Sequence, residues 1–125
     1  MVYTESEKRK LDNILNAFSD FIREQNYFDI VYSEKLGYIR ILVRDYYLET
    51  PQTLATVQEM LETLCYEIVA DAVFAPDNKQ NRLTAEAETK IERRLTEIVR
   101  RMGEDKDCCL DYIDNYMKKY LEDYK

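Results

Sequence analysis

The acidic side chains best spaced for chemistry lie within residues 51–76, between the chain's two prolines. Glu59 and Glu62 are three residues apart, and Glu67 and Asp71 are four apart, spacings at which helical side chains share a face. Such carboxylate pairs can bind a divalent metal or act as acid and base. Metal-binding helical bundles usually combine glutamates with Glu-x-x-His motifs, and this chain has no histidine. A carboxylate- or metal-dependent enzyme is therefore an alternative function, and we expect no catalytic residue, metal or cofactor.

A row of tyrosines near the end of the sequence suggests a contact surface. Tyr112, Tyr116, Tyr120 and Tyr124 recur every four residues, so on a helix they form a stripe that winds slowly round the axis. The rings can cover the edge of the core with their hydroxyls in water. Alternatively they can contact a partner, because tyrosine is enriched at protein interfaces. The spacing leaves both interpretations open.

Four arginines make residues 85–102 locally basic: Arg93, Arg94, Arg100 and Arg101. A nucleic-acid-binding protein usually has a basic patch in a basic domain. Here Glu92 and Glu97 interrupt the arginines, and the formal net charge of the chain is -7. We therefore expect the arginines to pair with the acidic helix over residues 51–75, within or between subunits, and we do not expect nucleic acid as a partner.

The negative charge is concentrated in one part of the chain. Residues 45–80 have one basic side chain, Lys79, and seven acidic ones, a net charge of -6. Three cysteines, with Cys108 and Cys109 adjacent, make a poor disulfide framework and are typical of a reducing compartment. The first residues, MVYTESEKRK, are polar, and no apolar run approaches the ~20 residues of a membrane span. We expect a cytoplasmic protein without a membrane partner.

Apolar residues at three- and four-residue spacing predict four helices, over residues 5–25, 51–75, 85–102 and 107–123. Thr4 and Glu7 have the spacing of a capping box at the start of the first helix. Thr50 is expected to cap the second helix, with Pro51 at its first position. Thr84 is expected to cap the third.

Between the first two helices the apolar period changes to two, which predicts a β-hairpin with strands at 28–33 and 38–44. We expect a four-residue loop over residues 34–37, with Gly37 in the left-handed conformation. A two-stranded sheet leaves two unpaired edges, which is one reason to expect a homodimer.

The hairpin pattern also predicts a register, because directly opposed residues of antiparallel strands share a face of the sheet. Ile30 is expected opposite Ile41, and Phe28 opposite Val43, on the side of the core. A register shifted by one residue would place the apolar residues of the two strands on opposite faces.

Together these elements predict an α+β protein that is mainly α. Residues 1–125 are expected to form a single domain, since this length suits one hydrophobic core. We expect an antiparallel bundle of about four helices, with one β-hairpin between the first and second helices.

The function that these features favour is a non-enzymatic protein–protein interaction module. Its partner-binding residues are expected on an acidic helix face and on the tyrosine stripe: Glu59, Glu62, Tyr66, Tyr112, Tyr116 and Tyr120. An alternative is an acidic inhibitor or immunity-type protein whose carboxylates occupy a basic groove on its target. The partner is expected to be a protein, and the module itself a homodimer.

Overall fold

The computed structural model describes residues 3–43 and 51–125. In this part of the chain there are five α-helices and one three-stranded antiparallel sheet, so the protein is α+β with α predominating. The predicted hairpin is present as β1 and β2, but a third strand joins its sheet, and there are five α-helices where about four were predicted. The elements are α1 (Glu5–Ala17), α2 (Ser19–Glu24), β1 (Phe28–Ser33), β2 (Gly37–Leu42), β3 (Gln52–Leu54), α3 (Val57–Val73), α4 (Ala85–Arg101), the 3-10 helix η1 (Gly103–Asp105) and α5 (Lys106–Asp123).

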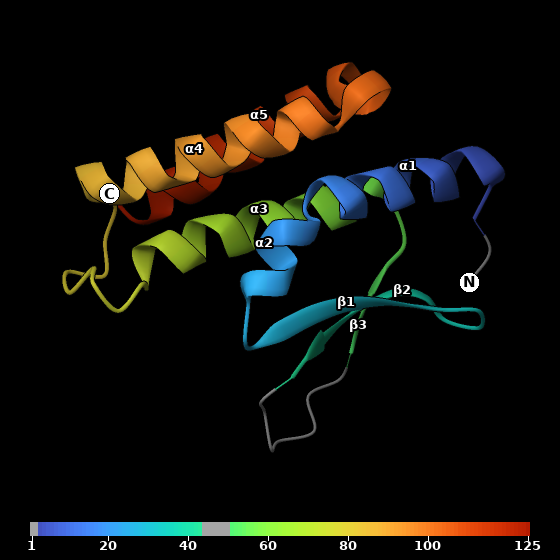
Figure 1. Ribbon diagram of the computed structural model, residues 1–125, viewed down its shortest axis with the longest axis horizontal. Helices are drawn as coiled ribbons and strands as arrows, with labels where there is room; N and C mark the ends of the chain where they lie inside the picture. Colours follow the sequence, from blue (N-terminus) through green and yellow to red (C-terminus); the bar gives the residue numbers. More distant parts are fainter. Residues whose placement is uncertain (1–2, 44–50) are drawn as a thin grey trace. The chain divides into compact units, whose positions relative to one another are not determined.

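The chain divides into two compact units, Met1–Met60 and Leu61–Lys125, with the boundary inside α3. The first unit contains the sheet, α1 and α2, and the second contains most of α3 together with α4 and α5 (Figure 1). The organisation of the chain as a single domain stays a prediction. None of the described helices combines the length and hydropathy needed to cross a membrane.

The first helix starts as its sequence predicts. Thr4 Oγ1 accepts a hydrogen bond from the Glu7 N–H, and Glu7 Oε1 accepts one from the Thr4 N–H, each over 3.1 Å. This exchange is a complete capping box, which satisfies N–H groups that have no partner inside the helix. Leu11 and Ile14 follow on the buried side of α1.

The predicted helix over residues 5–25 is two helices, α1 and α2, with a break at Phe18. Phe18 has φ -88° and ψ 0°, outside the helical region. The Ser19 hydroxyl donates to the Asn16 carbonyl oxygen over 2.7 Å, a local bond that competes with regular helical bonding. Apolar periodicity continues across the break, since Phe18 and Phe21 are both buried, so the pattern alone could not reveal it.

The sheet has the strand order β1-β2-β3, and β2 is paired on both sides (Figure 1). β3 lies in a segment that was predicted to be helical. It pairs antiparallel with β2, so that Leu54 lies opposite Tyr38. Leu54 is fully buried, as its place in the apolar pattern predicts, but it contributes to the core from a strand.

The predicted register of the hairpin is wrong by one residue, because neither Ile41 nor Val43 has the expected partner. Apolar side chains therefore occupy both faces of the sheet. Phe28 and Ile30 lie on one face and Ile39 on the other, and all three are buried. The observed pairs are Ile30 with Arg40 and Phe28 with Leu42.

The shorter loop explains the shifted register. Ser33 pairs with Gly37, so the loop has three residues instead of the predicted four. Ser33 Oγ accepts hydrogen bonds from the N–H groups of Lys35 (3.3 Å) and Leu36 (3.2 Å), which tightens the turn. Gly37 has φ +81°, so its predicted left-handed conformation is confirmed, although it lies in β2.

The central helix α3 begins later than predicted. Pro51 precedes β3 and is outside the helix, and Thr50, the expected cap, lies outside the described residues. Thr56 Oγ1 accepts from the Glu59 N–H over 3.0 Å, and Glu59 Oε2 accepts from the Ala55 N–H over 2.6 Å. These bonds stabilise the start of the helix at the residues that follow β3.

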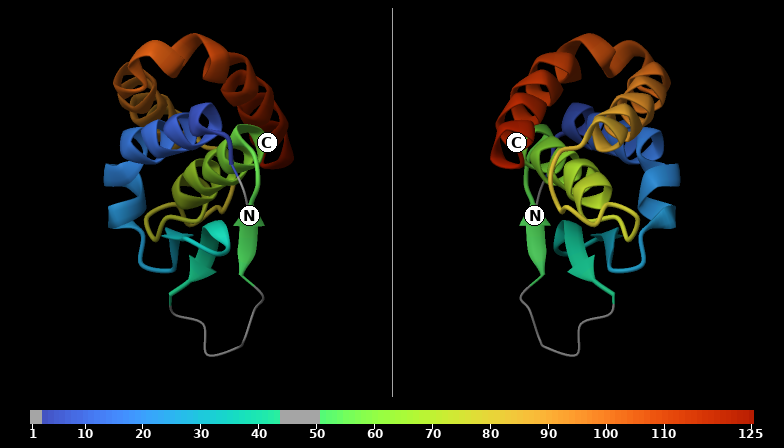
Figure 2. Two further views of the ribbon diagram at one scale, coloured as in Figure 1. Left: turned by 90° about the vertical axis from the view of Figure 1, so that its right-hand side faces the viewer. Right: turned by 90° about the vertical axis from the view of Figure 1, so that its left-hand side faces the viewer.

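In the unit Leu61–Lys125, α4 runs antiparallel to α3, and α5 runs antiparallel to α4 (Figure 1). In Figure 2, η1 lies at the top of each view, where the chain turns from α4 to α5. The bounds of α4 and α5 agree with the predicted ranges to within one residue. Thr84 Oγ1 accepts from the Ala87 N–H over 3.1 Å, which confirms the predicted cap of α4. Gly103, at the turn, has φ +57°.

Candidate protein-interaction site on α3 and α5

Four of the six predicted contact residues lie together, two on α3 and two on α5. The Tyr120 hydroxyl donates to Glu62 Oε1 over 3.3 Å. The ring of Tyr66 meets the ring of Tyr120 edge-on, with centroids 5.5 Å apart, and Tyr116 stacks on Tyr120 at 6.3 Å. We call Glu62, Tyr66, Tyr116 and Tyr120 the tyrosine–glutamate cluster.

Helical spacing explains how the cluster forms. Glu62 and Tyr66 are four residues apart on α3, and Tyr116 and Tyr120 are four apart on α5, so each pair shares one side of its helix. The sequence therefore predicted each pair correctly as a shared face. It could not predict that the acidic face and the tyrosine stripe would be one site, because that depends on how α3 and α5 pack.

Tyr120 is the most enclosed member of the cluster, with 9% of the residue exposed, whereas Tyr66 is 41% exposed. Burial, together with the charge and hydrogen bond of Glu62, raises the pKa of Tyr120 to about 12. The hydroxyl therefore stays neutral near pH 7 and acts as a donor to the carboxylate.

Lys119 belongs to the site, although the sequence analysis did not select it. Its ammonium lies 3.8 Å from Glu62 Oε1 and 5.3 Å from the centroid of the Tyr120 ring. The side chains of Lys119 and Glu62 are 60% and 42% exposed. Lys119 lies three residues after Tyr116, so helical spacing offered a signal that could have found it.

Two further aromatic residues extend the surface along the same helices. Phe74, the residue after α3, meets Tyr124, the residue after α5, with ring centroids 5.5 Å apart and the rings nearly perpendicular. Burial raises the pKa of Tyr124, and Tyr66 contributes to the same shift. Phe74 is 53% exposed.

Glu59 and Tyr112, the remaining predicted contact residues, have no described contact with the cluster. The carboxylate of Glu59 bonds the backbone at the start of α3, as described above. Tyr112 is 39% exposed on α5. The acidic face is also less uniform than predicted, because Glu67 is only 2% exposed.

The predicted pairing of the α4 arginines with the acidic helix is confirmed for Arg94, whereas Arg100 and Arg101 pair within α4. Asp71 Oδ2 of α3 lies 3.4 Å from Lys90 Nζ and 3.5 Å from Arg94 Nη2. On α4 itself, Arg100 and Arg101 both pair with Glu97. These contacts engage much of the basic surface that a nucleic-acid interface would need.

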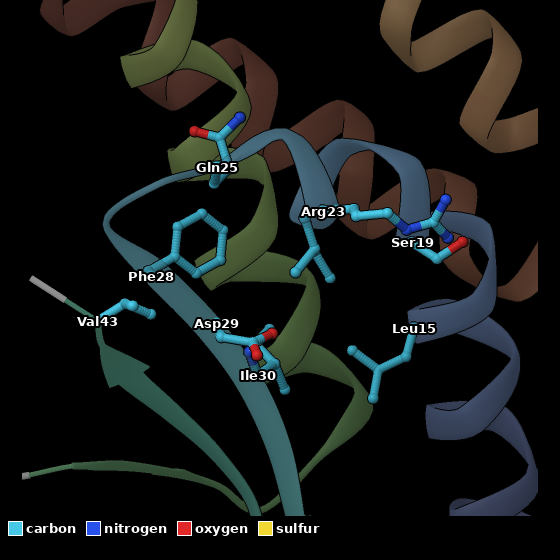
Figure 3. Close-up of a pocket in the computed structure, with 9 residues that line it drawn as sticks. Leu15, Ser19, Arg23, Gln25, Phe28, Asp29, Ile30 and Val43 are labelled. Carbon is cyan, nitrogen blue, oxygen red and sulfur yellow. The ribbon is translucent and has the colours of Figure 1, made fainter.

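A second feature is a cavity of about 500 Å³ beside β1 (Figure 3). Its lining is mainly apolar, with Leu15 of α1, Ile22 of α2, and Phe28 and Ile30 of β1. Asp29 adds a carboxylate, whose Oδ1 accepts the Ile30 N–H over 2.8 Å. No single sequence pattern indicates this cavity, because its residues come from different elements.

The described residues contain no group of three or more carboxylate, cysteine or histidine side chains placed to hold a metal ion. Cys65 is buried, and burial raises the pKa of its thiol to about 12, which disfavours the reactive thiolate. Cys108 and Cys109 have their sulfur atoms 3.9 Å apart and are not joined by a disulfide bond.

Comparisons of the chain with models of protein families, with curated proteins and with solved structures find no match.

Proposed function

We propose that the protein is a non-enzymatic protein–protein interaction module and that the tyrosine–glutamate cluster is its contact surface. The observation that supports this is the convergence of Glu62 and Tyr66 with Tyr116 and Tyr120, through the bond from Tyr120 to Glu62 and the ring contacts. The surface offers aromatic area at low entropic cost beside one carboxylate, a composition that suits interface hot spots.

The experiment compares two tyrosine substitutions in binding to a partner purified from the native host. Tyr66→Ala removes a ring of the cluster. Tyr32→Ala is the matched control, because Tyr32 is 42% exposed against 41% for Tyr66 and also contacts one neighbouring tyrosine ring. We expect Tyr66→Ala to weaken binding by about tenfold, as truncation of a hot-spot residue does. Equal effects of the two substitutions would contradict the proposed surface.

A second candidate, an acidic inhibitor or immunity-type protein, is supported by the charge distribution. Residues 45–80 have a net charge of -6, and the Glu62 carboxylate is 42% exposed. Such a protein would associate quickly with a basic groove, and association would slow as salt screens the attraction. An association rate that does not change with ionic strength would count against this candidate.

Homodimer formation stays a prediction, and the edge of β1 counts against a dimer formed by pairing of strands. The Val43 N–H donates to the Tyr27 carbonyl oxygen over 2.8 Å. Hydrogen-bonded and non-hydrogen-bonded pairs alternate along antiparallel strands, so the pair of Ile30 and Arg40 is not hydrogen-bonded and the Ile30 N–H points away from β2. Asp29 Oδ1 accepts that N–H. An edge whose donor is already bonded is a poorer template for another strand. Light scattering after size exclusion tests the dimer, and a mass near 15.0 kDa would contradict it.

A further inference from the structure

We propose that the tyrosine–glutamate cluster binds a lysine or arginine side chain of a basic protein segment, and that Lys119 occupies this position in the free protein. The proposal rests on the proposed function and names the chemistry of the partner. Binding would consist of the exchange of one cation for another beside Glu62, with no covalent step.

The position of Lys119 supplies the first argument. Its ammonium lies 3.8 Å from Glu62 Oε1 and 5.3 Å from the centroid of the Tyr120 ring. A carboxylate together with an aromatic face is the combination that attracts ammonium and guanidinium groups. The chain's own lysine thus shows where a cation is held at this surface.

The exposure of the pair supplies the second argument. The side chains of Lys119 and Glu62 are 60% and 42% exposed, and their charged atoms are near the outer limit of an ion pair. Exposed pairs of this kind contribute little to stability, so an incoming cation can replace Lys119 at a small cost. Tyr66 and Tyr116 contact the ring of Tyr120 and offer further ring surface to a partner's side chain.

A similar arrangement in the other unit provides an internal comparison. The Tyr38 hydroxyl donates to Asp12 Oδ1, Lys8 Nζ lies 2.9 Å from Asp12 Oδ2, and the same ammonium is 4.6 Å from the centroid of the Tyr32 ring. There the lysine and the carboxylate are in hydrogen-bond contact, so the cation position is filled more tightly. The longer contact between Lys119 and Glu62 is the one suited to exchange.

Charge complementarity favours a basic partner over a neutral or acidic one. The chain has a formal net charge of -7, and residues 45–80, which include Glu62, have a net charge of -6. A field of this sign raises the local concentration of cationic segments and speeds their association at low salt.

The test uses fluorescence anisotropy with labelled oligolysine and oligoarginine peptides, and oligoglutamate as the negative probe. Lys119→Met empties the cation position, and Lys118→Met changes the net charge equally at the adjacent exposed residue of α5. We expect Lys119→Met to bind the basic peptides about three- to fivefold more tightly than Lys118→Met, the size of one exposed cation contact. Glu62→Gln should bind more weakly than wild type by a similar factor. Circular dichroism checks that each variant is folded.

Equal affinities of the Lys119→Met and Lys118→Met variants would overturn the proposal, because binding would then follow net charge alone. So would binding of oligoglutamate as tight as that of oligolysine. The proposed function has a separate test in the Tyr66→Ala and Tyr32→Ala pair with the purified partner. If Tyr66→Ala weakens partner binding while Glu62→Gln and Lys119→Met do not change it, the contact surface stands and the cation site fails.

Discussion

The hydroxyl of Tyr3 donates a hydrogen bond to the carbonyl oxygen of Leu54 over 2.8 Å, across 51 positions of the sequence. The same hydroxyl accepts from the Tyr38 N–H over 3.1 Å. Since Tyr38 and Leu54 lie opposite each other in the sheet, this one phenol bridges β2 and β3. The segment before α1 is thereby attached to the sheet that follows it, so the strands and the first helix depend on each other.

Gly37→Ala should destabilise the protein more than Gly103→Ala. Both glycines have positive φ, +81° and +57°, where a Cβ costs about 1–2 kcal/mol. A Cβ on Gly103 would meet nothing within 4 Å, but one on Gly37 would lie 2.9 Å from Tyr3 Cε2 and 3.0 Å from Cζ. Accommodating it would displace the bridging hydroxyl, which adds about 1–3 kcal/mol. Urea unfolding followed by circular dichroism measures the difference.

The double variant with Tyr3→Ala provides the control for this prediction. Without the Tyr3 ring, the added cost of Gly37→Ala should fall to that of Gly103→Ala, because only backbone strain remains. A cost that is the same with and without the ring would show that the contact with Tyr3 is not what requires a glycine.

Tyr38 and Tyr120 should titrate at unusually high pH. Burial, together with the nearby carboxylates Asp12 and Glu62, raises the pKa of each from the usual 10.0 to about 12. Because the raised pKa favours the neutral phenol in the folded protein, the stabilisation is complete below about pH 10 and is lost as pH rises toward 12. In a spectrophotometric tyrosinate titration, Tyr38→Phe and Tyr120→Phe should each remove one late component. Tyr32→Phe should leave both components in place, and loss of either one in that variant would contradict the assignment.

The starts of α1 and α4 could be predicted from local signals. Thr4 with Glu7 and Thr84 with Ala87 cap their helices with the expected bonds, because capping depends on residues within one turn. The strands were harder to predict, because β3 depends on pairing with β2 rather than on its own sequence. The register followed the loop at Ser33 instead of the apolar alternation.

The two residue pairs of the candidate site could be predicted from the sequence, but the contact between them could not. Spacing identified Glu62 with Tyr66 and Tyr116 with Tyr120 as shared faces, but the contact between the pairs is a tertiary one. For Glu59 the sequence spacing predicted a shared face that does not form part of the site. Its position three residues before Glu62 suggested a common acidic face, whereas its carboxylate bonds the backbone where α3 begins.

Thr84→Ala should lower the free energy of unfolding by about 1 kcal/mol, because it removes the side chain that caps α4. Thr96→Ala is the matched control on the same helix. The Thr96 hydroxyl bonds the Glu92 carbonyl oxygen four residues earlier, and alanine is the better helix former at such an exposed position. We expect Thr96→Ala to be neutral or slightly stabilising in thermal or urea unfolding. A loss as large as that of Thr84→Ala would mean that the threonine methyl group, and not the cap, matters.

Glu59→Gln and Glu62→Gln should separate stability from binding, although both remove one negative charge from α3. The Glu59 carboxylate accepts the Ala55 N–H over 2.6 Å near the positive end of the helix dipole, so its loss should cost about 0.5–1 kcal/mol of unfolding free energy. The Glu62 carboxylate is 42% exposed and can be solvated, so Glu62→Gln should cost little stability. In binding to oligolysine the order should reverse, because only Glu62 lies beside the cation position and the rings of Tyr66 and Tyr120. Equal losses of peptide affinity in the two variants would show that the peptide responds to the overall negative charge of α3 and not to a site at Glu62. Equal stabilities of the two variants would show that the Glu59 carboxylate does not stabilise the start of the helix.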